Sequence, residues 1–383
     1  MAYKKLYFLL FLLTSLFFTC SQAEDKIAAQ NKLLNASWPV FRGDPGLTGI
    51  AHDPVPKKLK LRWSFQTTSD IVATPVIDQG RVVIGSTDGF VYAVNIDDGS
   101  ELWKFNTGDE VEASALVVDS TIFVGSLSGD FFALDAASGQ QKWKITMQSG
   151  IYGSANHATD ASDRVLILVG SYDNHVYAFD ATSGAQKWSV ETNNYINGAP
   201  ATNGNVVVFG GCDEILHIVK VADGSQIGSV PVGSYIPASP AISGNQAFVG
   251  HYGNALVCVD LSNQAVVWTY QPEKGEPFFS SPAVTLDRVV GGSRDDKLHC
   301  IDRKTGQPEW TFRAKDAIDS SPVIVGQDVF VGSDDGRLYR IDLKTGDMIW
   351  SYEIGAAITG CPAVAGGMVF ITAQDGVLYA FGG

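Results

Sequence analysis

The sequence of 383 residues has few charged side chains, and few of those are basic. Charged residues make up 18% of the chain and 40 residues are glycine, which excludes a disordered protein or a coiled coil and indicates many turns. Lysine and arginine number 27 against 41 aspartate and glutamate residues, so the formal net charge is −14. Because such a surface repels phosphate backbones, nucleic acid is not expected as a partner.

Motifs that bind metals are also missing from the sequence. Its 5 cysteines form no Cys-x-x-Cys pair, no His-Glu-x-x-His motif occurs, and the 6 histidines are scattered. Ligands for a structural or catalytic metal normally recur at such fixed spacings. The sequence therefore predicts no metal site.

Long apolar runs are absent beyond the N-terminus. Two lysines precede an apolar stretch over residues 6–18, which is too short to span a bilayer and is typical of an export signal. Two cleavage sites are compatible with it: small residues favour a cut before Glu24, and Cys20 would be lipidated after a lipoprotein-type cut. We therefore predict a signal peptide over residues 1–23 and an exported protein without a transmembrane span, either free or anchored at Cys20.

The remaining chain contains a repeat that tryptophan marks at intervals of 40 to 45 residues, with Gly228 at the one position where the tryptophan is lost. Each repeat holds four short runs rich in β-branched and aromatic residues, separated by Gly- and Asp-containing turns. Because many of these runs are apolar without alternation, we expect sheets buried on both faces, as in the blades of a β-propeller. The marking residues are Trp63, Trp103, Trp143, Trp188, Trp268, Trp310 and Trp350.

Eight repeats predict an all-β, eight-bladed β-propeller over residues 59–383, preceded by a polar lead-in over residues 24–58. The last repeat ends after its third strand, and its missing outer strand is supplied by the N-terminal run that contains Trp63. The N-terminal strand would thus close the last blade and remove an exposed sheet edge. Residues that recur in every blade, the tryptophans above all, are interpreted as packing anchors of the scaffold. Cys258 and Cys300 occupy equivalent positions of adjacent blades, about 10 Å apart, so no disulfide is predicted.

Residues that differ between repeats are the candidates for a binding site, because a site occurs once in the ring. Just before the inner strand of each repeat, an apolar residue alternates with variable ones, which we expect to face the mouth of the central channel. The aromatic ones gather on one half of that mouth. Such a half-ring suits a sugar or peptide, or it fills the rim of the channel. The candidate binding residues from these segments are Tyr152, Tyr195, Asn197, Tyr235 and Phe279. The hairpins between second and third strands, which we expect to open on the same face, add Tyr172, His251, Tyr252 and Arg294.

The unit that runs from Asn174 through Asp180 and Gly184 to Trp188 resembles the PQQ-like repeat, and residues 38–44 (WPVFRGD) resemble the segment that precedes such propellers. The resemblance covers residues 38–383. It implies an eight-bladed propeller in the cell envelope, in the periplasm or on the periplasmic face of the outer membrane. The family includes quinoprotein alcohol dehydrogenases and BamB, the non-enzymatic scaffold of outer-membrane β-barrel assembly.

The resemblance leaves three functions open. The size, blade number, compartment and lack of a catalytic constellation favour a monomeric BamB-like scaffold without cofactor, whose partners are envelope proteins such as barrel-assembly components. A periplasmic propeller that binds a sugar, peptide or quinone-type ligand is the alternative. A dehydrogenase with PQQ and Ca²⁺ is disfavoured, because the adjacent cysteine pair of those enzymes is missing and Arg294 is the main cation for a tricarboxylate cofactor.

Overall fold

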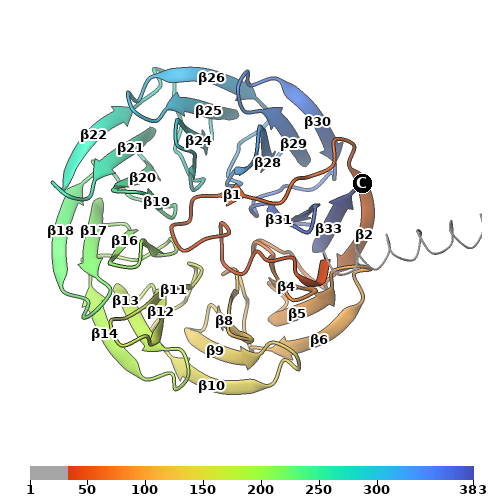
Figure 1. Cartoon of the computed structure of the whole chain (residues 1–383), viewed down its shortest axis with the longest axis vertical. Coiled ribbons are helices and arrows are strands. Elements are labelled where there is room, and N and C mark those ends of the chain that lie inside the picture. Colours follow the sequence, from red (N-terminus) through yellow and green to blue (C-terminus); the bar gives the residue numbers. More distant parts are fainter. Residues whose placement is uncertain (1–32) are drawn as a thin grey trace, which may run out of the picture.

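The computed structural model describes residues 33–383, which form eight antiparallel sheets arranged around a central axis (Figure 1). The predicted eight-bladed β-propeller is therefore confirmed. The predicted signal peptide and Cys20 lie outside the described residues. Within residues 33–383, no helix has the length and apolar character needed to cross a membrane.

Each blade has four strands, which are counted here from the axis outward. The inner strands are β3 (Val76–Asp78), β7 (Leu116–Val118), β11 (Asn156–Thr159), β15 (Ala201–Thr202), β19 (Ala241–Ser243), β23 (Ala283–Val284), β27 (Val323–Val325) and β31 (Ala363–Ala365). The second strands are β4 (Arg81–Gly85), β8 (Thr121–Gly125), β12 (Val165–Gly170), β16 (Val206–Gly210), β20 (Gln246–His251), β24 (Arg288–Gly292), β28 (Asp328–Gly332) and β32 (Met368–Thr372).

The two outer strands of each blade complete the sheets. The third strands are β5 (Phe90–Asn95), β9 (Asp130–Asp135), β13 (His175–Asp180), β17 (Ile215–Lys220), β21 (Ala255–Asp260), β25 (Lys297–Asp302), β29 (Arg337–Asp342) and β33 (Val377–Gly382). The outer strands are β6 (Glu101–Asn106), β10 (Gln141–Thr146), β14 (Gln186–Glu191), β18 (Gln226–Pro231), β22 (Ala265–Tyr270), β26 (Pro308–Arg313), β30 (Met348–Glu353) and β2 (Lys60–Gln66).

Burial explains the apolar runs of the second and third strands. In β4, the consecutive residues Val82, Val83 and Ile84 are all buried, because each blade packs between two neighbours and has no wet face. The outer strand β6 instead places exposed and partly buried residues in alternation along most of its length. The core therefore lies between the blades and follows the ring.

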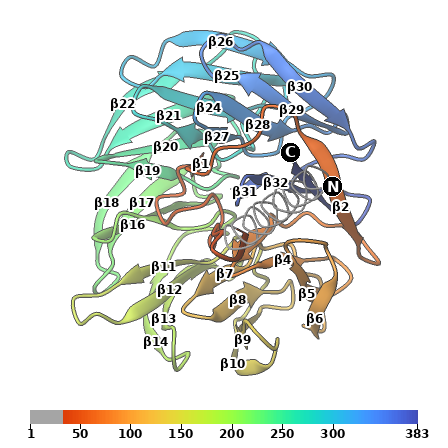
Figure 2. The same ribbon diagram turned by 45° about the vertical axis from the view of Figure 1, so that its right-hand side comes forward.

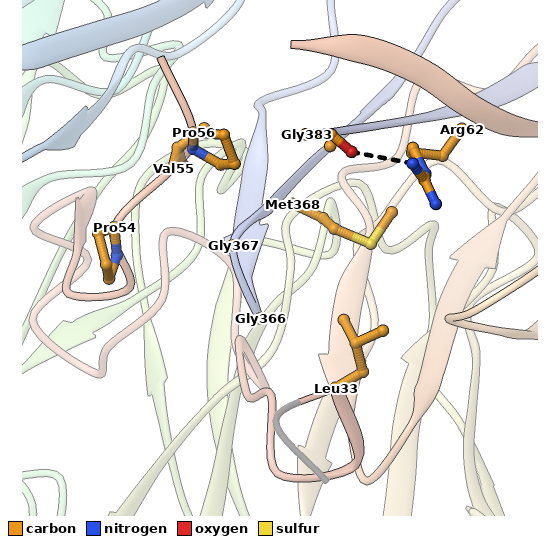
Figure 3. Close-up of a pocket in the computed structure, with 10 residues that line it drawn as sticks. Leu33, Pro54, Val55, Pro56, Arg62, Gly366, Gly367, Met368 and Gly383 are labelled. Atoms are coloured by element: carbon orange, nitrogen blue, oxygen red, sulfur yellow. Dashed lines mark hydrogen bonds between the residues drawn. The ribbon is translucent and has the colours of Figure 1, made fainter. Parts of the chain in front are cut away.

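The N-terminal strand closes the ring, as predicted. β2 pairs antiparallel with β33, with Trp63 opposite Ala380, so the last blade is built from both ends of the propeller (Figure 1). Arg62 Nη1 also donates to the Gly383 carbonyl oxygen at 2.9 Å (Figure 3). A cavity of about 480 Å³ lies beside this closure, lined by Leu33, Pro54, Val55, Pro56, Arg62, Gly366, Gly367, Met368, Gly382 and Gly383.

The recurring tryptophans join each blade to the next one. The indole Nε1 donates to a backbone carbonyl of the following blade. The ring packs against a glycine of that same following blade, in the turn between its third and outer strands, as Trp63 does at Gly99. These bonds give six blades the same anchor on the blade that follows. Six of them are present: Trp63 to Ile96 (3.0 Å), Trp103 to Ala136 (3.0 Å), Trp143 to Ala181 (3.1 Å), Trp188 to Val221 (2.9 Å), Trp268 to Arg303 (2.8 Å) and Trp310 to Leu343 (2.9 Å).

The repeat without a tryptophan has a different anchor. Where Gly228 replaces the tryptophan, the following blade replaces its turn glycine by Gln264, at a φ of 57°. The Gln264 side chain lies over Gly228, and its Nε2 donates to the Ile227 carbonyl oxygen at 2.7 Å. The two exceptions therefore compensate each other, since the glutamine takes the place of the missing ring.

The lead-in, residues 33–58, crosses the centre of the ring and bonds to every blade (Figures 1 and 2). It also adds the short strand β1 (Ile50–Ala51), which pairs parallel with β27. Its bonds reach the ends of the inner strands, on the face that also carries the turns between first and second strands. In order around the ring they join Trp38 to Ile77, Pro39 to Val117, Pro45 to Asn156 and Thr202, Gly46 to Ile242, Thr48 to Val284, Gly49 to Ile324 and Asp53 to Gly366.

The predicted polar lead-in is thus a packed part of the propeller. Trp38 and Leu47 are buried, and so is the guanidinium of Arg42. Arg42 Nη1 donates to the Pro322 carbonyl oxygen at 2.6 Å and approaches Cys361 Sγ at 3.3 Å. Because the lead-in closes this face of the ring, we call it the sealed face.

The cysteines of the described residues are free thiols. Cys258 lies opposite Trp268 and Cys300 opposite Trp310, so the two occupy equivalent places in adjacent blades. Burial raises the pKa of each of these two thiols to about 12. Both cysteines therefore act as small apolar core residues.

Candidate binding site at the open face

The face opposite the lead-in, called here the open face, is built from two loops of each blade. One loop leads from an outer strand to the next inner strand, and the other is the hairpin between second and third strands. In the first loop an apolar residue anchors the chain, and in seven blades the residue that follows it lines a cavity at the axis. The eight anchors are fully buried: Ile71, Val111, Ile151, Ile196, Ile236, Phe278, Ile318 and Ile358.

The residues that follow these anchors surround a small axial cavity. It has a volume of about 190 Å³, and Phe41 of the lead-in contributes to its lining. Among the residues that line it, Glu112 alone carries a charge. Seven blades each contribute one residue of this level: Val72, Glu112, Tyr152, Asn197, Pro237, Phe279 and Thr359.

A ring of hydroxyl groups lies one level deeper in the cavity. In six of the eight blades, a backbone N–H of the inner segment donates to the hydroxyl of the next blade, so these hydroxyls link adjacent blades at the axis. The printed sequence carries a signal for this ring, because six of eight repeats have Ser or Thr at this position; our sequence reasoning missed it. The bonds run from Thr74 to Ser114 (2.9 Å), Ser114 to Ser154 (3.1 Å), Ala199 to Ser239 (2.8 Å), Ser239 to Ser281 (3.1 Å), Ser281 to Ser321 (2.9 Å) and Cys361 to Thr74 (2.9 Å).

Three of the candidate tyrosines form one stack at the mouth of this cavity. The Tyr172 ring lies between Tyr152, at a centroid distance of 4.0 Å, and Tyr195, at 4.9 Å. The Tyr172 hydroxyl donates to Asn197 Oδ1 at 2.8 Å, and burial raises the pKa of this hydroxyl to about 12. The central ring of the stack is therefore held by a hydrogen bond, while the outer rings, Tyr152 and Tyr195, stay open to solvent.

A second aromatic group lies across the mouth. Tyr252 meets Phe279 edge-on, with ring centroids 5.4 Å apart, and the guanidinium of Arg294 lies 3.6 Å from the Phe279 centroid. Arg294 also holds Asp319 through three hydrogen bonds of 2.7 to 3.1 Å. The positive charge of Arg294 is therefore already neutralised within the chain.

Tyr235 and His251 lie between these two groups but differ in access. Tyr235 is exposed, and its ring contacts no other aromatic ring within residues 33–383. His251 is buried, and its Nδ1 accepts the Gly253 N–H at 3.0 Å. Its expected place at the mouth surface is therefore corrected: the imidazole supports a turn, in a position that holds a buried serine in most other blades.

The charges of the open face are mostly negative. Burial raises the pKa of Glu112, and the nearby Glu110 raises it further. Burial also raises the pKa of Asp334 to about 6, helped by the neighbouring Asp319. Asp334 Oδ1 is buried without a hydrogen-bond partner in the described chain. Sequence reasoning did not select Glu112 or Asp334 for the site, because it followed the aromatic residues.

These residues do not fit PQQ and Ca²⁺. A tricarboxylate needs several cations, whereas the lining of the cavity contains none and Arg294 is paired with Asp319. In residues 33–383, no cluster of three or more His, Cys, Asp or Glu side chains could hold a metal ion. The cavity is also smaller than the roughly 300 Å³ at which ligand pockets begin.

Comparisons with known proteins agree with the fold. A family model described as "Beta-alanine-activating enzyme, beta-propeller" matches residues 122–382, and one described as "Outer membrane protein assembly factor BamB" matches residues 56–117. Among curated proteins there is no match.

Several solved structures share the fold. BamB from Moraxella catarrhalis is 21% identical, with 85% of this chain and 98% of that chain covered and a TM-score of 0.71. The quinohemoprotein alcohol dehydrogenase ADHIIG from Pseudomonas putida HK5 is 13% identical, with 93% and 81% covered and a TM-score of 0.77. A europium-containing methanol dehydrogenase is also 13% identical, with 91% and 98% covered and a TM-score of 0.74. These likenesses establish the fold alone. Because the first family model covers more than half of the sequence, the chain belongs to the β-propeller family of the beta-alanine-activating enzyme, one of the PQQ-like propellers.

Proposed function

We propose that this protein is an exported, non-catalytic scaffold of the bacterial cell envelope, which binds a partner protein of the outer-membrane assembly system through its open face. The proposal extends to the whole chain what the name of its N-terminal match, an outer membrane protein assembly factor, says of that family. It takes the export signal of the sequence as the route to that compartment.

One observation carries the proposal: exposed tyrosines gather on one half of the open face. Tyr152, Tyr195, Tyr235 and Tyr252 are 37%, 48%, 49% and 50% exposed, and they come from neighbouring blades. Tyrosine is enriched at protein interfaces, where the ring supplies contact area and the hydroxyl supplies a hydrogen bond. An apolar patch with this polar rim is typical of a docking surface.

The spread of these rings favours a protein over a small molecule. A small ligand is normally enclosed in a pocket, whereas the axial cavity holds about 190 Å³ and the tyrosines lie around it on the surface. A ligand-binding propeller is the second candidate, supported by the parallel stack of Tyr152, Tyr172 and Tyr195, which suits the flat face of a sugar.

Site-specific photocrosslinking in cells tests the proposal. A photoreactive amino acid at Tyr235 should capture an outer-membrane barrel or a barrel-assembly component, identified by mass spectrometry. The matched control is Leu286, which is 93% exposed in a turn of the sealed face and should capture neither. The double variant Tyr195→Ala, Tyr235→Ala should abolish capture by a reporter at Tyr252 while the unfolding temperature stays unchanged.

The possible outcomes separate the candidates. Unchanged capture in the double variant, or capture from Leu286 alone, would overturn the scaffold at this face. If no envelope protein is captured and a sugar or peptide raises the unfolding temperature in a Tyr195-dependent way, the ligand-binding propeller takes its place.

A further inference from the structure

The axial cavity of the open face contains a carboxylate that the protein leaves without a counter-charge. Glu112 reaches the cavity from the loop between β6 and β7. Its side chain makes no hydrogen bond or ion pair within residues 33–383. Every other residue of the lining is neutral, so nothing in the wall of the cavity compensates this charge.

Acidic residues in the hairpins between second and third strands, unlike Glu112, have side-chain partners in several blades. Where they lie beside the third strands, they are bonded to a tyrosine or histidine four residues later, as in Asp173 to Tyr177 at 2.9 Å and Asp213 to His217 at 2.8 Å. Asp319 is held by Arg294. Glu112 therefore differs from these hairpin carboxylates. Asp334 Oδ1 also lacks a hydrogen-bond partner in the described chain, but Asp334 lies outside the lining of the axial cavity.

A protein that docks on the tyrosines also covers this cavity. Covering removes the water that now solvates Glu112, and burying a carboxylate without a partner is strongly unfavourable. An uncharged partner surface would thus be repelled, whereas a positive side chain would relieve the cost. The formal net charge of −14 favours the approach of such a partner as well.

We propose that the axial cavity receives one basic side chain, a lysine or an arginine, from an extended segment of the partner protein, with its positive group paired to Glu112. This inference rests on the proposed function, because it places the partner on the open face. The apolar stem of the side chain would pass between Tyr152 and Phe279, which line the cavity from loops three blades apart.

The hydroxyl ring completes the site for a cation. Each hydroxyl oxygen that accepts one backbone N–H has a second lone pair, which an ammonium or guanidinium group can use. Ser114 and Ser154 lie on the same side of the ring as Glu112, in the same and the next blade. A basic group would therefore find one carboxylate and neutral acceptors together.

Binding of three small probes to the full protein tests this inference. The probes are the N-acetyl methylamides of lysine, arginine and norleucine, the last having a similar stem without the charge. Ligand-observed NMR should detect the two basic probes and give a much weaker signal for norleucine. In Glu112→Gln the affinity for the basic probes should fall by at least about tenfold. Glu110→Gln, on the exposed neighbour outside the lining, is the matched control and should keep most of it.

Equal binding of norleucine, unchanged affinity in Glu112→Gln, or no binding of either basic probe would overturn the inference. The proposed function is tested separately, by crosslinking at Tyr235. Capture of an envelope partner without probe binding refutes the basic side chain alone, and probe binding without any capture supports the cation site while refuting the scaffold.

Discussion

The two faces of the ring are built from the same repeat, yet they differ in how much of their bonding is used inside the chain. On the sealed face, residues 33–58 bond to all eight blades and bury Trp38 and Arg42. On the open face, exposed tyrosines and the free carboxylate of Glu112 have no such cover. A symmetric scaffold thus has one face that stabilises it and one face that is free for recognition. The two faces differ because of residues that do not repeat from blade to blade.

The largest expected effect breaks the sealed face. Trp38→Ala removes a buried indole that packs against Gly43 and whose backbone pairs with Ile77. The free energy of unfolding should fall by about 3–5 kcal/mol, the usual cost of truncating a buried aromatic side chain. Urea denaturation measures this loss. If the faces are independent, the folded fraction of the variant should still crosslink its partner from Tyr235.

Leu34→Ala is the control for this change, because Leu34 lies in the same segment and is exposed. It should alter the free energy of unfolding by less than about 0.5 kcal/mol. An equally small effect of Trp38→Ala would show that the lead-in rests on the ring without stabilising it, and the contrast between the faces would fail.

Much of this architecture was predictable because the chain repeats. The blade number, the closing strand β2 and the outer-strand place of the tryptophans follow from comparing one repeat with the next. The path of the lead-in could not be predicted in this way, since Trp38 and Arg42 occur once and no second copy shows which way they face. Their burial depends on contacts with blades far along the chain.

The candidate site was predictable in part, and one error is instructive. The alternation around the buried anchors pointed to both flanking positions of each repeat, and the position after the anchor lines the axial cavity in seven blades, because strand-like chain alternates its sides. His251 was placed at the mouth because the hairpin between second and third strands was expected to open there, but it is the last residue of β20 and is buried. The equivalent position is Ser86 or Ser126 in other blades, both buried, so a histidine there is forced inside. Glu112 could be selected only from the structure, which shows that its carboxylate lines the axial cavity without a partner.

A medium effect sharpens the description of the open face. Tyr172→Phe removes the hydroxyl that donates to Asn197 and keeps the ring between Tyr152 and Tyr195. The free energy of unfolding should fall by about 1 kcal/mol, as for one hydrogen bond. Crosslinking of the partner from Tyr235 should persist, because the stack is preserved. Tyr172→Ala, which deletes the stack, should weaken capture strongly, so equal capture by both variants would remove the tyrosine stack from the interface.

The smallest effect concerns charge and depends on pH. Because the pKa of Asp334 is raised to about 6, this group favours the folded state at low pH and loses that advantage as pH rises from the ordinary value of 3.8 through about 6. The groups that act on it are Asp319, Asp316 and Asp335, which raise its pKa, and Arg294, which lowers it. Asp334→Asn removes the unfavourable charge at neutral pH. Since the group is half-exposed, the gain should be about 1 kcal/mol at most.

Thermal unfolding of Asp334→Asn and the unaltered protein at about pH 7.5 and about pH 4 measures this effect. The variant should unfold at a higher temperature at the higher pH, and the difference should shrink or vanish at the lower one. Asp347→Asn, on an exposed turn of the same blade toward the sealed face, is the matched substitution against which the change caused by Asp334→Asn is compared. If Asp334→Asn is no more stable at the higher pH, the open face does not store the electrostatic strain that distinguishes it here from the sealed face. If it is more stable and still captures its partner, that strain belongs to the free surface and is not needed for recognition.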